Sequence, residues 1–191
     1  MVGEATVYDT RTVYETVGAY KAHTVYKEKG SAPVNIVHIG DYDYNYVQIG
    51  DLLWTTENFK QNTSLSVWYN NTPNDKGKLY TWNDFTEINN LLSDGWRIPT
   101  RSDGANLITG RTASSLLATS EGGTNETGFS FILAGYRFAD NSFYDVGSEG
   151  DFLLSQQGYR IRATSYDSSF STPNYDYNDN YRFSMRFCKN A

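Results

Sequence analysis

The chain has 191 residues, which suffice for one domain of ordinary size and a small additional segment. Hydrophobic residues make up only 39%, whereas aromatic residues reach 16%, so we expect rings to supply much of the core volume. The net charge is -6 and the Lys and Arg residues are scattered, which argues against nucleic acid and anionic membranes as partners.

Two further features of the sequence concern membranes and export. No segment approaches the ~20 consecutive apolar residues of a membrane span, so we expect no membrane insertion. The chain begins Met-Val-Gly-Glu-Ala-Thr, without a basic stretch followed by an apolar run, so we expect no signal peptide.

The first part of the chain has a rhythm of its own, in which Thr-Val-Tyr occurs at residues 6–8, 12–14 and 24–26. This alternation favours strands, although residues 15–29 could support a short helix. Gly-Ser-Ala-Pro at 30–33 is typical of a linker. We therefore expect residues 1–40 to form a small β-rich appendage for attachment or oligomerisation, with a homotrimer as one possibility, and residues 41–191 to form the main domain.

The main domain contains short strand-like runs between turn residues, including residues 46–49 before Gly50 and residues 79–82 after Gly77. Helical patterns are scarce. We predict helices over 83–92 and 101–108, the second with Thr100 or Ser102 as its N-cap. Many short strands, few helices and long loops indicate an α+β domain.

Several segments of this domain form one recognisable pattern. The most specific are Gly-Trp-Arg-Ile-Pro-Thr at 95–100 and Ala-Gly-Tyr-Arg at 134–137, and they are accompanied by the runs 47–54, 56–59, 79–82, 127–129 and 182–189. Together these segments resemble the Fibrobacter succinogenes major paralogous domain family. The chain departs from the family pattern at 152–155, where a Trp and serines are common, and at Arg182, where Gly is usual.

The resemblance implies a C-type-lectin-like fold with short twisted antiparallel sheets, about two helices and long loops. It also implies that the motif aromatics belong to the core rather than to a sugar-stacking platform. The residues expected to be largely buried are Trp54, Trp82, Trp96, Phe129, Tyr136, Phe183 and Phe187.

The same fold and closing strand occur in variable proteins diversified by retroelements, including phage receptor-binding proteins. There, mutation directed to adenines turns Asn codons chiefly into Asn, Tyr, Asp and Ser. Residues 163–181 consist mostly of these four types and directly precede the closing strand.

The composition of this stretch supports a binding face on physical grounds too, because Tyr offers a large amphipathic contact area while Ser and Asn form adaptable hydrogen bonds. The alternative is a polar loop without a binding role. The predicted contact residues are Asn141, Phe143, Tyr144, Tyr159, Arg160, Arg162, Thr164, Tyr166, Ser168, Phe170, Tyr175, Tyr177 and Asn178.

No arrangement of residues recommends an enzyme, a metal site or a cofactor. Cys188 is the only cysteine, which excludes an internal disulfide and the thiol pair used by formylglycine-generating enzymes, which share the broader fold. Trp82-Asn83-Asp84 matches the calcium triplet of sugar-binding lectins but lies too early in the chain, without the accompanying loop. His23 and His38 lack partners at catalytic or ligating spacing.

The function that the sequence favours is therefore recognition of a host surface protein or glycan by a phage virion protein, located in the tail and diversified by a retroelement. The alternative is a bacterial cell-surface lipoprotein or adhesin domain.

Overall fold

The computed structural model describes residues 8–17, 19–28, 35–165 and 180–191. The chain divides into two compact units, residues 1–34 and residues 35–191. No helix in the described ranges is both long and apolar enough to cross a membrane.

The first unit contains one antiparallel hairpin, with β1 over Tyr8–Val17 and β2 over Ala19–Glu28. The strands predicted from the Thr-Val-Tyr rhythm are thus confirmed. The alternative helix over 15–29 is wrong, because β-branched and aromatic residues spaced at alternate positions suit a pleated strand. The expected linker at 30–33 lies outside the described residues.

The second unit begins earlier than the expected boundary at residue 40. Strand β3, Ile36–Ile39, pairs antiparallel with β4, Tyr42–Ile49, and so belongs to the main domain. Strand β5, Leu52–Thr55, follows β4 through a tight Gly50-Asp51 turn, and β12, Cys188–Asn190, pairs with β5. The resulting sheet has the order β12-β5-β4-β3.

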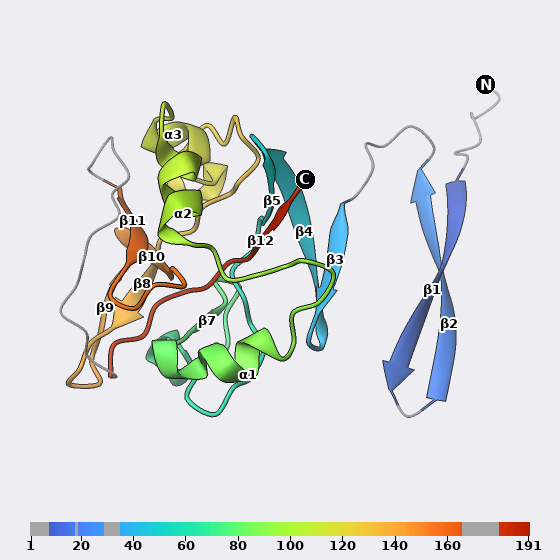
Figure 1. Ribbon diagram of the computed structural model, residues 1–191, viewed down its shortest axis with the longest axis horizontal. Helices are drawn as coiled ribbons and strands as arrows, with labels where there is room; N and C mark the ends of the chain where they lie inside the picture. The colour runs from blue at the N-terminus through green and yellow to red at the C-terminus, as the bar shows by residue number, and fades with distance from the viewer. Residues whose placement is uncertain (1–7, 18, 29–34, 166–179) are drawn as a thin grey trace, which may run out of the picture. The chain divides into compact units, whose positions relative to one another are not determined.

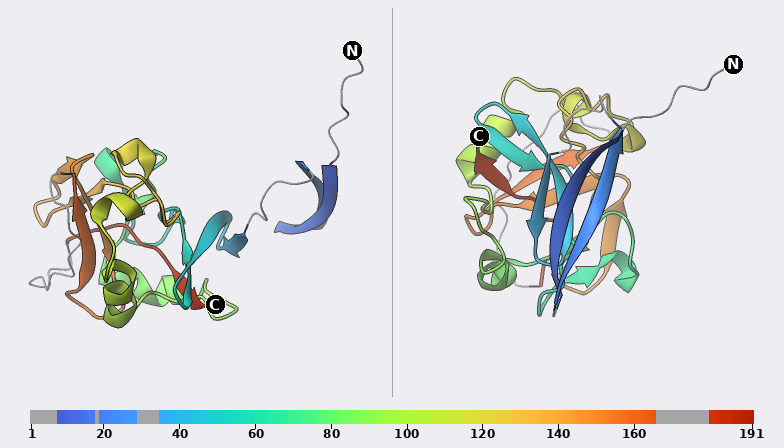
Figure 2. Two further views of the ribbon diagram at one scale, coloured as in Figure 1. Left: turned by 90° about the horizontal axis from the view of Figure 1, so that it is seen from above. Right: turned by 90° about the vertical axis from the view of Figure 1, so that its right-hand side faces the viewer.

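A second four-stranded sheet has the order β11-β10-β8-β9. Its strands are β8 over Ala134–Arg137, β9 over Phe143–Val146, β10 over Glu149–Leu153 and β11 over Arg160–Thr164. Figures 1 and 2 show the two sheets at opposite sides of the domain, with the C-terminal segment passing from one to the other. A two-stranded sheet pairs β6, Val67–Trp68, with β7, Lys78–Leu79.

The helices are short. Helix α2 covers Arg101–Ile108 with Thr100 as N-cap, as the sequence predicts. The helix expected over 83–92 is a 3-10 turn, η2 at Trp82–Asp84, followed by α1 at Phe85–Asn89. Helix α3, Ala113–Leu116, was not foreseen, since four residues are too few to show a helical period. Two further 3-10 turns are η1, Tyr69–Asn71, and η3, Thr119–Glu121.

Two clusters of buried side chains form the core of the domain. One surrounds Trp54, whose ring contacts those of Phe129 and Phe152 at centroid distances of 5.7 and 6.2 Å. The other includes Phe59 and Phe187, whose ring centroids lie 4.8 Å apart. Six of the seven aromatics expected in the core are buried, and the seventh, Tyr136, is half-buried.

Candidate binding surface

The β8–β9 hairpin carries the first group of predicted contact residues. Its tip turns at residues 138–141, where the Phe138 amide donates to the Ser142 carbonyl at 2.8 Å and the Asn141 amide donates to the Phe138 carbonyl at 3.1 Å. Asn141 adopts a left-handed conformation, with φ of 73°, and its side-chain oxygen accepts a hydrogen bond from the Arg137 guanidinium. Asn tolerates this conformation better than most residues do. The tip is therefore held in one shape by its own hydrogen bonds.

Rings from this hairpin and from the start of the closing segment form a continuous aromatic surface. Tyr136 and Tyr144 stack with centroids 5.9 Å apart, Phe138 meets the edge of Tyr144 at 6.0 Å, and Phe138 contacts Tyr181 at 4.7 Å. Tyr144 is 40% exposed and the other three are half-buried. We call Tyr136, Phe138, Tyr144 and Tyr181 the aromatic platform.

The backbone beneath the platform leaves no room for a side chain at Gly135. A Cβ there would lie 2.4 Å from the Tyr144 carbonyl oxygen and 2.8 Å from the Tyr69 ring. Gly135 also has a φ of 67°, a region that favours glycine. Tyr69 packs in turn against Phe143, with ring centroids 5.2 Å apart. The Gly of the Ala-Gly-Tyr-Arg motif thus allows β9 to lie close to β8.

We call residues 163–181 the Tyr-rich stretch. The described residues at its two ends lie beside this hairpin. At its start, the Ser165 amide donates to the Ser148 carbonyl at 2.9 Å, next to the turn that joins β9 to β10. At its end, Arg182 and Arg137 exchange two backbone hydrogen bonds of 3.0 Å. The predicted contact residues Tyr166, Ser168, Phe170, Tyr175, Tyr177 and Asn178 lie outside the described residues.

Two predicted contact residues are buried, which corrects the expectation that they project from the surface. Arg160 is 2% exposed and Thr164 is 6% exposed. The alternation along β11 places both on one face of the strand together with Arg162, which is half-buried. Arginine in a polar segment suggested exposure, but these arginines neutralise buried acids.

These acids are Glu149 and Asp151 on the neighbouring strand β10. The Arg160 Nε donates to Asp151 and the Arg162 Nη2 donates to Glu149, so two ion pairs cross between the strands. The guanidinium of Arg160 also lies over the Phe183 ring, 4.7 Å from its centroid. Burial raises the pKa of Asp151 to about 8, with the neighbouring Glu149 adding to the shift and Arg160 opposing it.

Tyr159 is half-buried and lies apart from the platform. Its ring packs against the core cluster around Trp54 and is covered by the Arg101 guanidinium, 4.4 Å from the ring centroid. The platform residues Tyr136 and Tyr181 pack against the other cluster. The structure thus brings together Tyr144, Phe143 and Asn141 on one hairpin but does not join Tyr159 to them.

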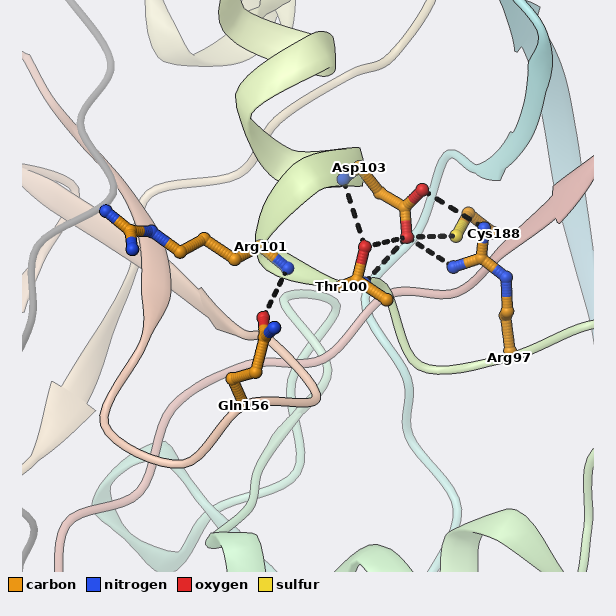
Figure 3. Close-up of polar contacts among 6 residues, drawn as sticks. All are labelled: Arg97, Thr100, Arg101, Asp103, Gln156 and Cys188. Carbon is orange, nitrogen blue, oxygen red and sulfur yellow. Dashed lines mark hydrogen bonds and ion pairs between the residues drawn. The ribbon is translucent and has the colours of Figure 1, made fainter.

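The N-terminus of α2 connects the Gly-Trp-Arg-Ile-Pro-Thr motif to the closing segment (Figure 3). Asp103 accepts hydrogen bonds from the Thr100 amide and hydroxyl at 2.7 Å and forms an ion pair with Arg97. Arg97 and Cys188 exchange backbone hydrogen bonds of 2.9 and 3.0 Å, which ties the closing strand to this corner. Burial, with the nearby Asp103 carboxylate, raises the pKa of the Cys188 thiol to about 12.

Arg186 performs a similar connecting role inside the core and was not singled out from the sequence. Its fully buried guanidinium donates to the Asn58 side chain at 2.9 Å, to the Phe129 carbonyl and to the Ser130 carbonyl at 2.6 Å. Burial lowers its pKa to about 9, which leaves it charged at neutral pH. A charged residue between the motif aromatics Phe183 and Phe187 was the available signal.

The lectin-type triplet Trp82-Asn83-Asp84 has a structural role in this chain. Asp84 is fully buried and accepts hydrogen bonds from the Thr81 amide at 2.9 Å and the Leu65 amide at 3.2 Å. Its carboxylate therefore caps η2 and fixes the position of the backbone at Leu65. Within the described ranges, no three His, Cys, Asp or Glu residues are grouped as a metal site would require.

The domain is of the mixed α+β class, made mostly of short strands in curled sheets with few helices. The family motifs contact one another at the N-terminus of α2 and around the buried Arg186 guanidinium, and the motif glycine Gly135 lies where β8 and β9 approach closely. The chain belongs to the Fibrobacter succinogenes major domain family, whose pattern matches residues 47–189. No curated protein and no solved structure matches the chain.

Proposed function

We propose that this chain is a non-enzymatic ligand-binding protein whose contact surface is the aromatic platform together with the Tyr-rich stretch that starts and ends beside it. The observation that carries the proposal is the continuous contact of four rings around a 40% exposed Tyr144. We further propose that the scaffold is C-type-lectin-like.

The platform has the composition and the support that a binding surface needs. Tyrosine rings give a large contact area with few rotatable bonds, so little conformational entropy is lost on binding. Beneath them, the Glu149 and Asp151 ion pairs and the close approach at Gly135 hold the sheet rigidly. Variation within the Tyr-rich stretch then changes the ligand while the residues of the core stay the same.

The partner we propose is a host surface protein or glycan, and the carrier is a phage tail protein diversified by a retroelement. A bacterial cell-surface adhesin is the alternative carrier for the same surface. Sequencing the neighbouring DNA distinguishes the two. A reverse transcriptase gene and a near-copy of the 3′ coding sequence, differing at adenines, support diversification, whereas a lipoprotein leader upstream supports the adhesin.

The binding surface is tested with fluorescently labelled protein on a panel of bacterial cells. Tyr144→Ala and the triple change of Tyr166, Tyr175 and Tyr177 to Ala should each reduce cell binding about tenfold or more, because exposed rings at the centre of an interface carry binding energy. Tyr42→Ala, a half-buried Tyr on the other sheet, is the matched control and should bind normally. Unchanged binding by the platform variants, or unfolding of the triple variant, contradicts the assignment.

A further inference from the structure

A pocket of about 500 Å³ opens on the β12-β5-β4-β3 sheet, away from the platform strands β8 and β9. Pockets that bind small molecules commonly enclose roughly 300–1,000 Å³ and combine apolar walls with a few polar groups. Its lining includes His38, Tyr46, Leu53, Asp94, Trp96 and Lys189.

One wall of the pocket is a tight turn at residues 93–96. The Trp96 amide donates to the Ser93 carbonyl at 2.9 Å, and both central residues are left-handed, Asp94 with φ of 53° and Gly95 with φ of 83°. Asp-Gly is the sequence that such a turn favours. Trp96 leaves this turn to meet Tyr46 of β4, with ring centroids 5.4 Å apart. The aromatic part of the pocket is therefore preorganised.

Charged groups of both signs stand around the opening. The stem of Lys189 runs alongside Gly95, at 3.8 Å from where a Cβ would lie, so its ammonium group is positioned beside the turn. Asp94 accepts a hydrogen bond from the Ser93 hydroxyl at 3.1 Å. Among the residues that the structure describes, no ion pair joins Asp94 to Lys189. At another part of the pocket lining, the His38 Nδ1 forms a hydrogen bond of 2.8 Å with the Asp43 Oδ1.

This combination selects against strongly charged ligands, because either sign of charge meets one group that repels it. Hydroxyl groups suit both rim residues, since a hydroxyl can donate to the Asp94 carboxylate and accept from the Lys189 ammonium. The ring of the half-buried Tyr46, which packs against the buried Trp96, offers apolar surface together with Leu53 to the C–H face of a sugar ring. We infer that the pocket binds a pyranose unit of a neutral glycan.

This site is additional to the proposed function and does not depend on it, because none of its lining residues belongs to the platform or to the Tyr-rich stretch. A chain with both sites would bring the platform's ligand and a glycan together on opposite sheets of one domain. The two sites can therefore be tested separately in the same protein.

The experiment is an NMR titration of the intact, isotope-labelled chain with glucose, galactose, mannose and N-acetylglucosamine. At least one sugar should shift the Trp96 indole and the Lys189 amide in a saturable way and leave the Tyr144 amide unchanged. Tyr46→Ala should abolish saturation. Asp94→Asn, which keeps the left-handed turn, and Lys189→Met, which keeps the stem, should each weaken binding about tenfold, as loss of a hydrogen bond to a charged group does.

Asp75→Asn, an exposed change outside the pocket, and Tyr144→Ala on the platform are the controls and should leave the titration unaltered. The inference is overturned if no sugar gives a saturable shift, or if the pocket variants bind sugar as the unmodified chain does. Saturation by a zwitterion such as glycine betaine, with none by the sugars, also overturns it. Cell binding that survives the pocket variants leaves the platform proposal standing in every case.

Discussion

Asp103 accepts hydrogen bonds from the guanidinium of Arg97 through both of its carboxylate oxygens. The same carboxylate receives the Thr100 amide, so one side chain closes the capping box of α2 and binds the segment that enters the helix. Because Arg97 also pairs with Cys188 through its backbone, the contact stabilises the meeting point of the Gly-Trp-Arg-Ile-Pro-Thr motif and the closing strand.

Replacing Asp103 by Ala should therefore destabilise the domain by about 2 kcal/mol, the sum of a lost cap and a partly exposed ion pair. The measurement is urea unfolding followed by tryptophan fluorescence. Ser102→Ala, an exposed change in the same helical turn, is the control and should alter the free energy of unfolding by less than about 0.5 kcal/mol. Equal effects of the two changes would show that Asp103 has no capping role.

The contribution of Asp103 should also depend on pH. Although burial opposes it, hydrogen bonding to Arg97 and Thr100 lowers the pKa of Asp103 in the folded chain. A lowered folded pKa means that the stabilisation is present above the unfolded pKa of about 3.9 and is lost as the pH falls through the folded value. As the pH is lowered from 5 to the point of acid unfolding, the free energy of unfolding should therefore fall less for Asp103→Asn than for the unmodified chain.

The sequence predicted those parts of the fold that have local causes. Thr100 lies after a proline and before a helical pattern, and the structure confirms both the cap and the span of α2. The motif aromatics were recognisable as core because their neighbours are apolar. The boundary at 34/35 was missed because β3 is defined by pairing with β4 and not by any change in composition.

Gly135→Ala should destabilise the domain by at least about 2 kcal/mol more than Gly147→Ala does, since overpacking adds to backbone strain. Both glycines have positive φ, but a Cβ at Gly135 meets the Tyr144 carbonyl at 2.4 Å, whereas at Gly147 nothing lies within 4 Å. Thermal unfolding of the two variants gives the comparison. Similar losses would mean that conformational strain alone explains both, and that β8 and β9 can move apart.

The buried ion pairs predict a second dependence on pH, of opposite sign. Burial raises the pKa of Asp151 to about 8 in the folded chain, because the cost of desolvating the carboxylate outweighs its attraction to Arg160. Its contribution is fully present below the unfolded pKa of about 3.9 and is lost as the pH rises through 8. The unmodified chain should lose stability relative to Asp151→Asn between pH 5 and pH 9, measured by urea unfolding. A constant difference between the two would refute the shift.

The candidate surface was less predictable than the fold, for a physical reason. Arg160 and Tyr144 both lie in polar, aromatic segments, so composition alone predicted both as ligand-contacting residues. Their burial differs because Arg160 lies in the buried strand β11 and forms an ion pair with Asp151 on β10, while Tyr144 lies in β9 at the edge of the sheet. Strand pairing decides this, and a single sequence does not reveal which strands are neighbours.

Arg186→Met should destabilise the domain by roughly 3–5 kcal/mol, although it keeps most of the side-chain volume, because it leaves buried acceptors without a donor. The acceptors are the Phe129 and Ser130 carbonyls, which the guanidinium joins to Asn58 in a distant loop. Arg111→Met is the control, since Arg111 bonds only carbonyls of its own helix end and is half-buried. Denaturant unfolding measures both changes. Near-neutral behaviour of Arg186→Met would mean that water replaces the guanidinium, and that the aromatic packing of Phe129 and Phe187 holds these loops together without it.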